Sequence, residues 1–227
     1  MKVAIYTCLT NGYDILRQPL YVEDGFDFLC FVGKGEKTSD YDGVWRIIEI
    51  PLTFDNAAID SRYPKILPHE FLQDYDYSIW IDANIEIKGP TLYKAAREKI
   101  AAQAEYCGVS HPWRKSIYKE TWKCAWLKLI TPATAVRNMF RLLKGRMPFN
   151  YGLYENNLIL RKHNSPSIIA LDEMWWEDFM KAPKRDQTLL MYCLFRSGIP
   201  HQLLLSRGVN TRNCPDLEYH LHLKAPY

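Results

Sequence analysis

Two polar residues interrupt an apolar stretch in the middle of the sequence. Asp82 and Asn84 follow the run YSIWI at residues 77–81, and they share the even positions of this segment with Trp80. Carboxylate and amide oxygens suit Mg²⁺ or Mn²⁺, so the pair could hold a metal ion together with phosphates bound to it. The alternative is a half-solvated strand or a hydrogen-bonded turn, which an Asp-x-Asn tripeptide alone also fits.

A cationic pair precedes this stretch by about twenty residues. Arg62 and Lys65, in SRYPK, fall on a predicted helix. A guanidinium fork and a compact ammonium are the groups that stabilise a diphosphate leaving group. The alternative is an exposed helical ion pair with Glu70 or Asp60.

Carboxylates that could act on a hydroxyl occur in the second half. In KRDQTLL, Arg185, Asp186 and Gln187 stand at the start of a predicted helix. Asp186 could be its N-cap, or Asp186 and Gln187 could hold sugar hydroxyls or face a reacting carbon. A general base for an acceptor hydroxyl could be any of four residues, among which the sequence does not choose: Glu155, Glu177, Asp178 and Asp186.

The elements that must position these residues alternate between strands and helices. With 227 residues, 48% hydrophobic and 24% charged, the chain has the composition of a soluble globular domain. We predict an α/β fold with a mixed, mostly parallel sheet flanked by helices. Strands are expected at residues 2–9, 26–33, 45–52, 75–87, 106–111 and 152–163, helices at 60–72, 89–104, 117–130, 133–145, 172–182 and 186–198, and a loop-like tail after 209.

No linker or repeat marks a boundary, so a single domain over residues 1–227 is expected, with a nucleotide-binding half (1–110) and an acceptor-shaping half (111–227). Ligands of open α/β sheets collect beyond the carboxyl ends of the strands. The polar residues expected to converge there are Thr7, Asn11, Tyr13, Asp14, Asp82 and Asn84. Tyr13 or Tyr6 could stack on a base, and Asn11 and Asp14 could bind a base or ribose, although such residues also form turns.

Positive charge is concentrated in one segment. From His111 to Arg146 there are nine Lys or Arg and one Glu, a net of +8, whereas the whole chain carries +3. This asymmetry favours an anionic partner, such as a phosphate, an acidic glycan or a membrane surface. A solvated helix face is the alternative, and no nucleic-acid partner is expected because no nucleic-acid-binding module is recognisable. His111 and Arg114 could line a donor or acceptor site.

The aromatic and cysteine residues add two expectations. Trp175 and Trp176, with Glu177 beside them, could form a platform for acceptor sugars, or Trp175 and Trp176 could belong to the core. The six cysteines are scattered and lack CxxC spacing, which indicates free thiols in a reducing compartment and no zinc site. No secretion signal or membrane span is recognisable, so a cytoplasmic location is expected, with peripheral contact at the inner face of the membrane through residues 111–146.

Taken together, several spaced segments resemble the TOD1/MUCI70 glycosyltransferase-like domain family. They are spread over about residues 3 to 196: YTCLTNGYD, RYPKILPH, YDYSIWIDANIEI, HPWRKSIYKE, GRMPFNYGLYENNLILRKHN, MWWEDF and KRDQTLLMY. The resemblance implies a GT-A-type, Rossmann-like fold and a variant Asp-x-Asp metal motif at Asp82 and Asn84, with Mn²⁺ or Mg²⁺ as cofactor. Asn84 departs from the second carboxylate of that motif.

The resemblance also implies roles near the chain's end. Asp186 and Gln187 are similar to the Asp-Gln pair near the donor sugar in glycosyltransferase family 8. Enzymes of that family also bind their metal ion with a C-terminal histidine, to which His220 or His222 could correspond. The implied reaction transfers a sugar from a nucleotide diphosphate to a glycan or lipid-linked acceptor, in polysaccharide biosynthesis. Alternatives are a nucleotidyltransferase, a catalytically silent carbohydrate- or nucleotide-binding module, and a membrane-surface interaction protein.

Overall fold

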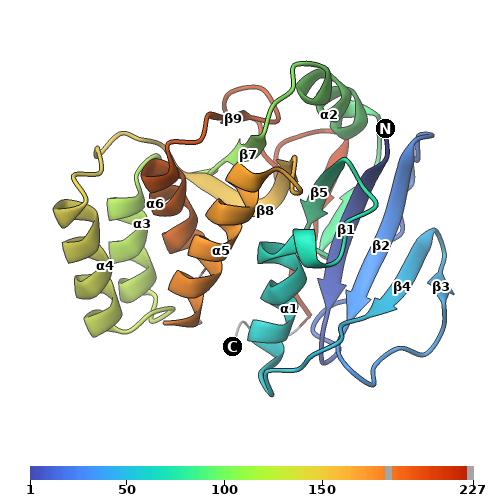
Figure 1. The fold of residues 1–227 in the computed structure, drawn as a ribbon, viewed down its shortest axis with the longest axis horizontal. Coiled ribbons are helices and arrows are strands. Elements are labelled where there is room, and N and C mark those ends of the chain that lie inside the picture. The colour runs from blue at the N-terminus through green and yellow to red at the C-terminus, as the bar shows by residue number, and fades with distance from the viewer. Residues whose placement is uncertain (182–185, 224–227) are drawn as a thin grey trace.

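One eight-stranded sheet runs through the molecule (Figure 1). The computed structural model describes residues 1–181 and 186–223. The strands of this sheet are β1 (Val3–Leu9), β2 (Phe26–Val32), β3 (Tyr41–Asp42), β4 (Trp45–Glu49), β5 (Tyr77–Ile81), β7 (Tyr106–Ser110), β8 (Tyr154–Arg161) and β9 (His201–Leu203). Their order across the sheet is β3-β4-β2-β1-β5-β8-β7-β9.

Most of the sheet is parallel, as expected. Strands β4, β2, β1 and β5 run in one direction, and β9 pairs parallel with β7. Strand β8 runs antiparallel to both of its neighbours, β5 and β7. Ile81 therefore lies opposite Leu158, and Ser110 lies opposite Tyr154. The first residues of β8 consequently lie at the edge where the parallel strands end.

Helices cover both faces of the sheet. They are α1 (Ala57–Ile66), the short 3₁₀ helix η1 (Pro68–Glu70), α2 (Thr91–Ala101), α3 (Ile117–Trp126), α4 (Pro132–Lys144), α5 (Pro166–Met180) and α6 (Gln187–Ser197). On one face Tyr6 packs in a core with residues of α1, α5 and α6, and on the other face Ile5 packs with residues of α2. Burial on both sides explains why the central strands are almost entirely apolar.

The strand predicted at residues 75–87 is wrong, because it is two strands in different sheets. Strand β5 ends at Ile81, and the backbone N–H of Ile85 then donates to the Asp82 carbonyl at 2.9 Å, which closes a turn. Strand β6 (Ile85–Ile87) pairs antiparallel with β10 (Leu217–Tyr219), in a tail that was expected to be a loop. Asp82 and Asn84 thus lie in a turn, not on one face of a strand.

Two helices begin at least three residues earlier than predicted. Helix α1 begins at Ala57, because the Asn56 side chain accepts from the backbone N–H groups of Ala58 and Ile59, at 3.0 and 3.3 Å. Pro64 lies inside α1, and Pro68 starts η1. Helix α5 begins at Pro166, because proline suits a first helical position. In the described ranges, no helix is long and apolar enough to cross a membrane.

Candidate active site

A buried lysine joins two carboxylates at the edge where the parallel strands end. Lys65 Nζ lies 3.1 Å from Asp186 Oδ2 and 3.4 Å from Asp82 Oδ1. Arg62 Nε lies 3.9 Å from Asp186 Oδ1, and the indole N–H of Trp80 donates to Asp82 Oδ1 at 2.6 Å. The structure therefore brings together four predicted residues from three segments, which we call the Lys65 centre: Arg62, Lys65, Asp82 and Asp186.

The charges of the Lys65 centre compensate one another. Lys65 is only 3% exposed, and a buried ammonium is tolerated only when counter-charges and hydrogen bonds replace its water. The carboxylates of Asp82 and Asp186 supply them. The side chain of Asp82 is 31% exposed and that of Arg62 is 38% exposed, so an anionic group and a cationic group of the centre both reach solvent. The centre can thus meet a ligand without first uncovering its lysine.

A second buried charge pair fixes the helix that carries Lys65. Arg161 is fully buried, and its guanidinium donates to Asp172 Oδ1 at 2.9 Å and to the Tyr6 hydroxyl at 2.6 Å. It also donates to the carbonyl oxygens of Lys65 and Ile66. The last carbonyls of a helix lack partners within the helix, so Arg161 satisfies them and ties the end of α1 to the sheet.

Asp186 is held from two sides. The indole N–H of Trp175 donates to the Asp186 carbonyl at 3.1 Å, and the Asn156 amide lies 3.5 Å from Asp186 Oδ2. The Asp186 side chain makes no capping bond to α6. Trp175 is fully buried, so in this conformation it supports Asp186 and offers no surface to an acceptor sugar. The Gln187 amide donates to the Tyr154 carbonyl at 3.2 Å, and Arg185 lies outside the described residues.

The start of β8 adds a row of polar side chains to this edge. Glu155 Oε1 accepts from Arg212 at 2.8 and 3.2 Å. Burial raises the pKa of Glu155, and the positive charge of Arg212 opposes the rise. Glu155 Oε2, Asn156 Oδ1 and Asn157 Oδ1 are buried and have no hydrogen-bond partner among the described residues. Buried acceptors without donors are costly, so this row is suited to a polar ligand that supplies donors or a cation.

Sequence reasoning missed Asn156, Asn157 and Arg212. The signal for the first two was the polar triplet ENN before the apolar LIL at residues 158–160. It could be interpreted only once β8 was known to run antiparallel, since that direction brings its beginning to the site. Arg212 had no signal, because it reaches Glu155 from the tail.

Asn84 and Asp82 present oxygens that fit a hard divalent cation. Asn84 is buried, its amide nitrogen donates to the His220 carbonyl at 2.7 Å, and its Oδ1 has no partner among the described residues. An orphaned amide oxygen two residues from a carboxylate is the donor chemistry that Mg²⁺ and Mn²⁺ prefer. The histidines are turned elsewhere: His220 Nε2 lies 2.9 Å from Glu86 and His222 Nδ1 lies 2.7 Å from Asp14.

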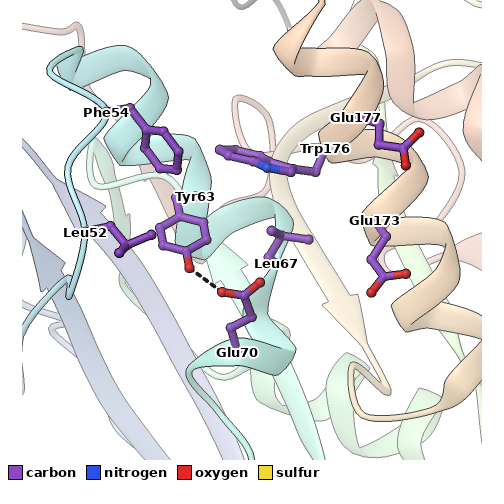
Figure 2. Close-up of a pocket in the computed structure, with 8 residues that line it drawn as sticks. All are labelled: Leu52, Phe54, Tyr63, Leu67, Glu70, Glu173, Trp176 and Glu177. Carbon is purple, nitrogen blue, oxygen red and sulfur yellow. Dashed lines mark hydrogen bonds between the residues drawn. The ribbon is translucent and has the colours of Figure 1, made fainter.

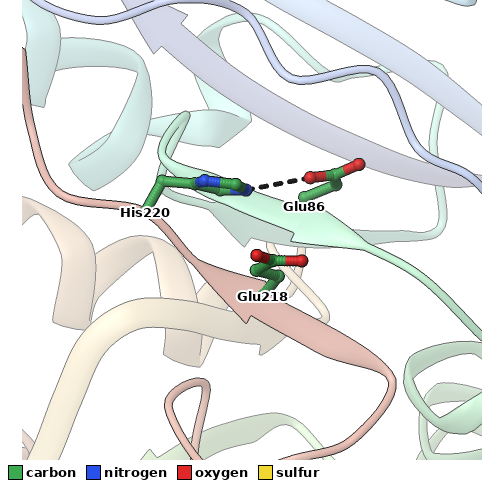
Figure 3. A group of neighbouring side chains, drawn as sticks. All are labelled: Glu86, Glu218 and His220. Atoms are coloured by element: carbon green, nitrogen blue, oxygen red, sulfur yellow. Dashed lines mark hydrogen bonds and ion pairs between the residues drawn. The ribbon is translucent and has the colours of Figure 1, made fainter.

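His220 belongs to a different group of side chains. The ligand atoms of Glu86, Glu218 and His220 all lie within 4.8 Å of one another, on β6, on β10 and just after β10 (Figure 3). Within the described part of the chain, no group of three or more such His, Cys, Asp or Glu ligands includes Asp82. The four predicted metal ligands, Asp82, Asn84, His220 and His222, are thus not gathered around one point by their side chains.

The tail lies against the loop that follows β1. The carboxylate of Asp14 accepts from His222 and from the backbone N–H of Leu223, and the rings of Tyr13 and His222 are 5.1 Å apart. The backbone N–H of Asn11 donates to Glu36 at 2.8 Å. Thr7 is buried in β1. Asp14 is therefore engaged by the chain's own tail.

The residues predicted to meet an acceptor lie in two other places. Arg114 pairs with the buried Glu120, and His111 Nδ1 accepts backbone N–H groups of the turn before α3 at 3.1 and 3.2 Å. Trp176 and Glu177 line a pocket of about 370 Å³ between α1 and α5 (Figure 2). The other residues that line this pocket are Leu52, Phe54, Tyr63, Leu67, Glu70 and Glu173, so no member of the Lys65 centre is among them.

Comparisons with known proteins agree with the resemblance seen in the sequence. Residues 1–205 match the model of the TOD1/MUCI70, glycosyltransferase-like domain. A relative from Arabidopsis thaliana, named Alkaline ceramidase TOD1, is 23% identical over 192 residues, which cover 71% of this chain and 41% of the relative. The aligned region thus spans less than half of that protein's length. The chain belongs to the TOD1/MUCI70 glycosyltransferase-like domain family.

Proposed function

We propose that the chain transfers a sugar from a nucleotide-diphosphate donor to an acceptor hydroxyl, and that the Lys65 centre binds the diphosphate. The observation that carries this proposal is the sharing of buried Lys65 by Asp82 and Asp186, with Arg62 beside them, at the sheet edge where ligands of α/β folds bind. The family's glycosyltransferase-like character supports it.

The chemistry follows from the charges that develop. As the bond from the sugar to the diphosphate breaks, negative charge accumulates on the leaving oxygen, and fixed cations stabilise it. Arg62 is partly exposed and can reach a phosphate, whereas Lys65 supplies a charge whose position is set by two carboxylates and by the Arg161 network. Asp82 is oriented by the Trp80 indole and by Lys65.

A divalent metal ion is the proposed cofactor. Mn²⁺ or Mg²⁺, when bound, supplies Lewis-acid stabilisation of the leaving diphosphate. Asp82 and Asn84 would hold it through the exposed carboxylate and the unpartnered Asn84 Oδ1. His220 or His222 would have to leave its present carboxylate partner to join them.

Glu155 is the carboxylate best suited to act as the general base. Burial raises its pKa, and a raised pKa makes a carboxylate a stronger base. Arg212 orients one oxygen, and the other oxygen is buried with no described partner. We propose a glycan or a lipid-linked glycan as the acceptor, with the Trp176 ring and Glu177 offering contacts for its sugars.

The test is a thermal-shift and turnover experiment. The protein is heated with a panel of nucleotide sugars, with and without Mn²⁺ or Mg²⁺, and release of nucleoside diphosphate is then measured for any donor that raises Tm. We expect a metal-dependent rise for one base, which Asp82→Ala abolishes and the control Asp74→Ala, at an exposed aspartate, retains. Full turnover by Asp82→Ala would refute the assigned role.

Ceramide hydrolysis is assayed in parallel, because it is the reaction in the relative's name. Hydrolysis of the ceramide amide needs water and no nucleotide sugar. Release of fatty acid without any nucleotide, together with the absence of a nucleotide-induced shift, would overturn the transferase proposal. Nucleotide binding without turnover on any acceptor would instead identify a binding module.

A further inference from the structure

The basic segment forms a helical hairpin at one end of the molecule. Figure 1 shows α4 at the end farthest from β3, with α3 between α4 and the rest of the fold. Helix α3 packs inward through residues such as Tyr118 and Cys124, and α4 packs through Ala135 and Leu142. The remaining faces of both helices are exposed.

Large apolar side chains lie on these exposed faces. On α3, Trp122 is 55% exposed and Trp126, one turn later, is 72% exposed. On α4, Phe140 is 66% exposed and Leu143, also one turn later, is 56% exposed. Residues three or four apart share a helix face, so each helix carries an apolar ridge. Others exposed in this region are Trp113, Leu127, Val136 and Phe149.

The cations of the hairpin are mostly unneutralised. Arg114 and Arg141 form ion pairs with Glu120 and Asp178. Within the described residues, no carboxylate pairs with the other seven: Lys115, Lys119, Lys123, Lys128, Arg137, Lys144 and Arg146. Lys123 instead lies 3.5 Å above the ring of Trp126. We call these seven cations and the eight exposed apolar residues the α3–α4 surface.

We infer that the α3–α4 surface binds an anionic lipid bilayer. Tryptophan rings settle at the level of the lipid headgroups, and helices with an apolar ridge flanked by Lys and Arg lie in that interface. Each cation near an anionic leaflet adds about fivefold to the binding constant. A nucleic acid would match the charge but would leave the two apolar ridges without an apolar phase to enter. This inference does not depend on the proposed reaction.

The experiment is vesicle sedimentation with the full chain. Vesicles of phosphatidylcholine alone are compared with vesicles that also contain phosphatidylserine, at low and at high salt. We expect binding only to the anionic vesicles at low salt, with acrylamide quenching of tryptophan fluorescence reduced by binding. Of the seven tryptophans, Trp113, Trp122 and Trp126 are the exposed ones, so the quenching reports on this surface.

Two variants and one matched control localise the contact. Lys115→Glu/Lys119→Glu/Lys144→Glu should weaken binding by at least about a hundredfold, and Trp122→Ala/Trp126→Ala should remove most of the protection from quenching. The control Lys2→Glu/Lys34→Glu/Lys94→Glu makes the same charge change at exposed lysines outside the hairpin, and it should bind almost as the parent does.

Three outcomes would overturn the inference. The first is no binding to phosphatidylserine vesicles at low salt. The second is an equal loss of binding in the control and in the hairpin lysine variant, since the effect would then come from net charge. The third is a dimer in light scattering that Trp122→Ala/Trp126→Ala dissolves, which would assign the surface to a second copy of the chain.

Discussion

The Lys65 centre and the α3–α4 surface use positive charge in opposite ways. In the centre, a buried lysine is held by two carboxylates within 3.4 Å. On the surface, seven cations have no carboxylate partner among the described residues, and all of them except Lys123 are exposed. A buried, paired charge has fixed geometry and is little affected by salt, whereas solvated charges act over roughly a Debye length and are screened by salt. The Lys65 centre is therefore suited to recognise one small anion, whereas the α3–α4 surface is suited to attract a charged membrane.

The largest expected effect is a loss of folding stability when Lys65 of the Lys65 centre is replaced. Lys65→Met keeps most of the apolar stem but leaves Asp82 and Asp186 without the shared ammonium. Removing one partner of a buried charge pair costs about 3 to 5 kcal/mol, so we expect a loss of that size in the free energy of unfolding, measured with urea. Lys34→Met, at an exposed lysine, is the control and should be nearly neutral.

A double variant sharpens this result. Lys65→Met/Asp82→Asn removes one of the two uncompensated carboxylates, so part of the lost stability should return while diphosphate binding does not. Equal stability of Lys65→Met and the parent would show that the lysine is not needed to balance these carboxylates.

The free energy of unfolding should also depend on pH, through the buried side chain of His163. Burial lowers the pKa of His163 to about 4, from about 6.5 in the unfolded chain. The folded state therefore resists protonation, and stability that is present above pH 6.5 is lost as the pH falls toward 4. The loss from this group reaches about 3 kcal/mol. Urea unfolding of His163→Gln across this range should show a shallower decline than the parent, and an equally steep decline would contradict the assignment.

Arg212 lies between the two regions and should give a moderate effect. It pairs with Glu155, and its guanidinium lies 5.2 Å from the ring of Trp113. The charge of Arg212 lowers the pKa of Glu155 against the effect of burial, so Arg212→Gln should raise that pKa. If Glu155 is the base, the acidic limb of the pH–rate profile then moves to higher pH. An unmoved limb would remove Glu155 from the reaction.

The smallest effect on folding stability is expected for charge changes on the α3–α4 surface. Lys115→Glu/Lys119→Glu/Lys144→Glu should change the free energy of unfolding by about 0.5 kcal/mol or less, because these side chains are solvated. Raising the salt concentration should abolish vesicle binding by the parent and leave its urea midpoint little changed. A loss of several kcal/mol in this variant would mean that the hairpin is not the independent surface described above.

The sequence predicted the parallel half better than the rest, for physical reasons. Short apolar runs ended by polar residues identify buried strands, and the rule for strand ends then places Asp82 at one edge of the sheet. Arg62 and Lys65 were predicted on a helix, from the chemistry of a diphosphate alone. Asp186 was a candidate from a separate motif, KRDQTLL, and its contact with Lys65 was not predicted. Asn156 and Arg212 could not be placed, because neither the direction of β8 nor the return of the tail is encoded in local periodicity.

The same limit explains the wrong strand around Asp82 and the alternatives that the sequence left open for Trp175. Alternation from Ser78 to Ile87 mimicked one long strand, although β5 is buried on both faces and ends at Ile81. The paired tryptophans looked equivalent, yet only Trp176 lines a pocket, while Trp175 is buried beside Asp186. Burial of individual side chains depends on packing between segments, which a single sequence does not display.

The pairing of β6 with β10 has a consequence for how the molecule forms. Leu217 lies opposite Ile87, so this ladder joins segments roughly 130 residues apart, and such non-local pairings slow folding because loop-closure entropy is lost before their contacts form. The family match ends at residue 205, before Arg212 and β10. Arg212, which pairs with Glu155, lies in the same tail as β10, so this part of the site's edge is completed only when the tail packs against the sheet.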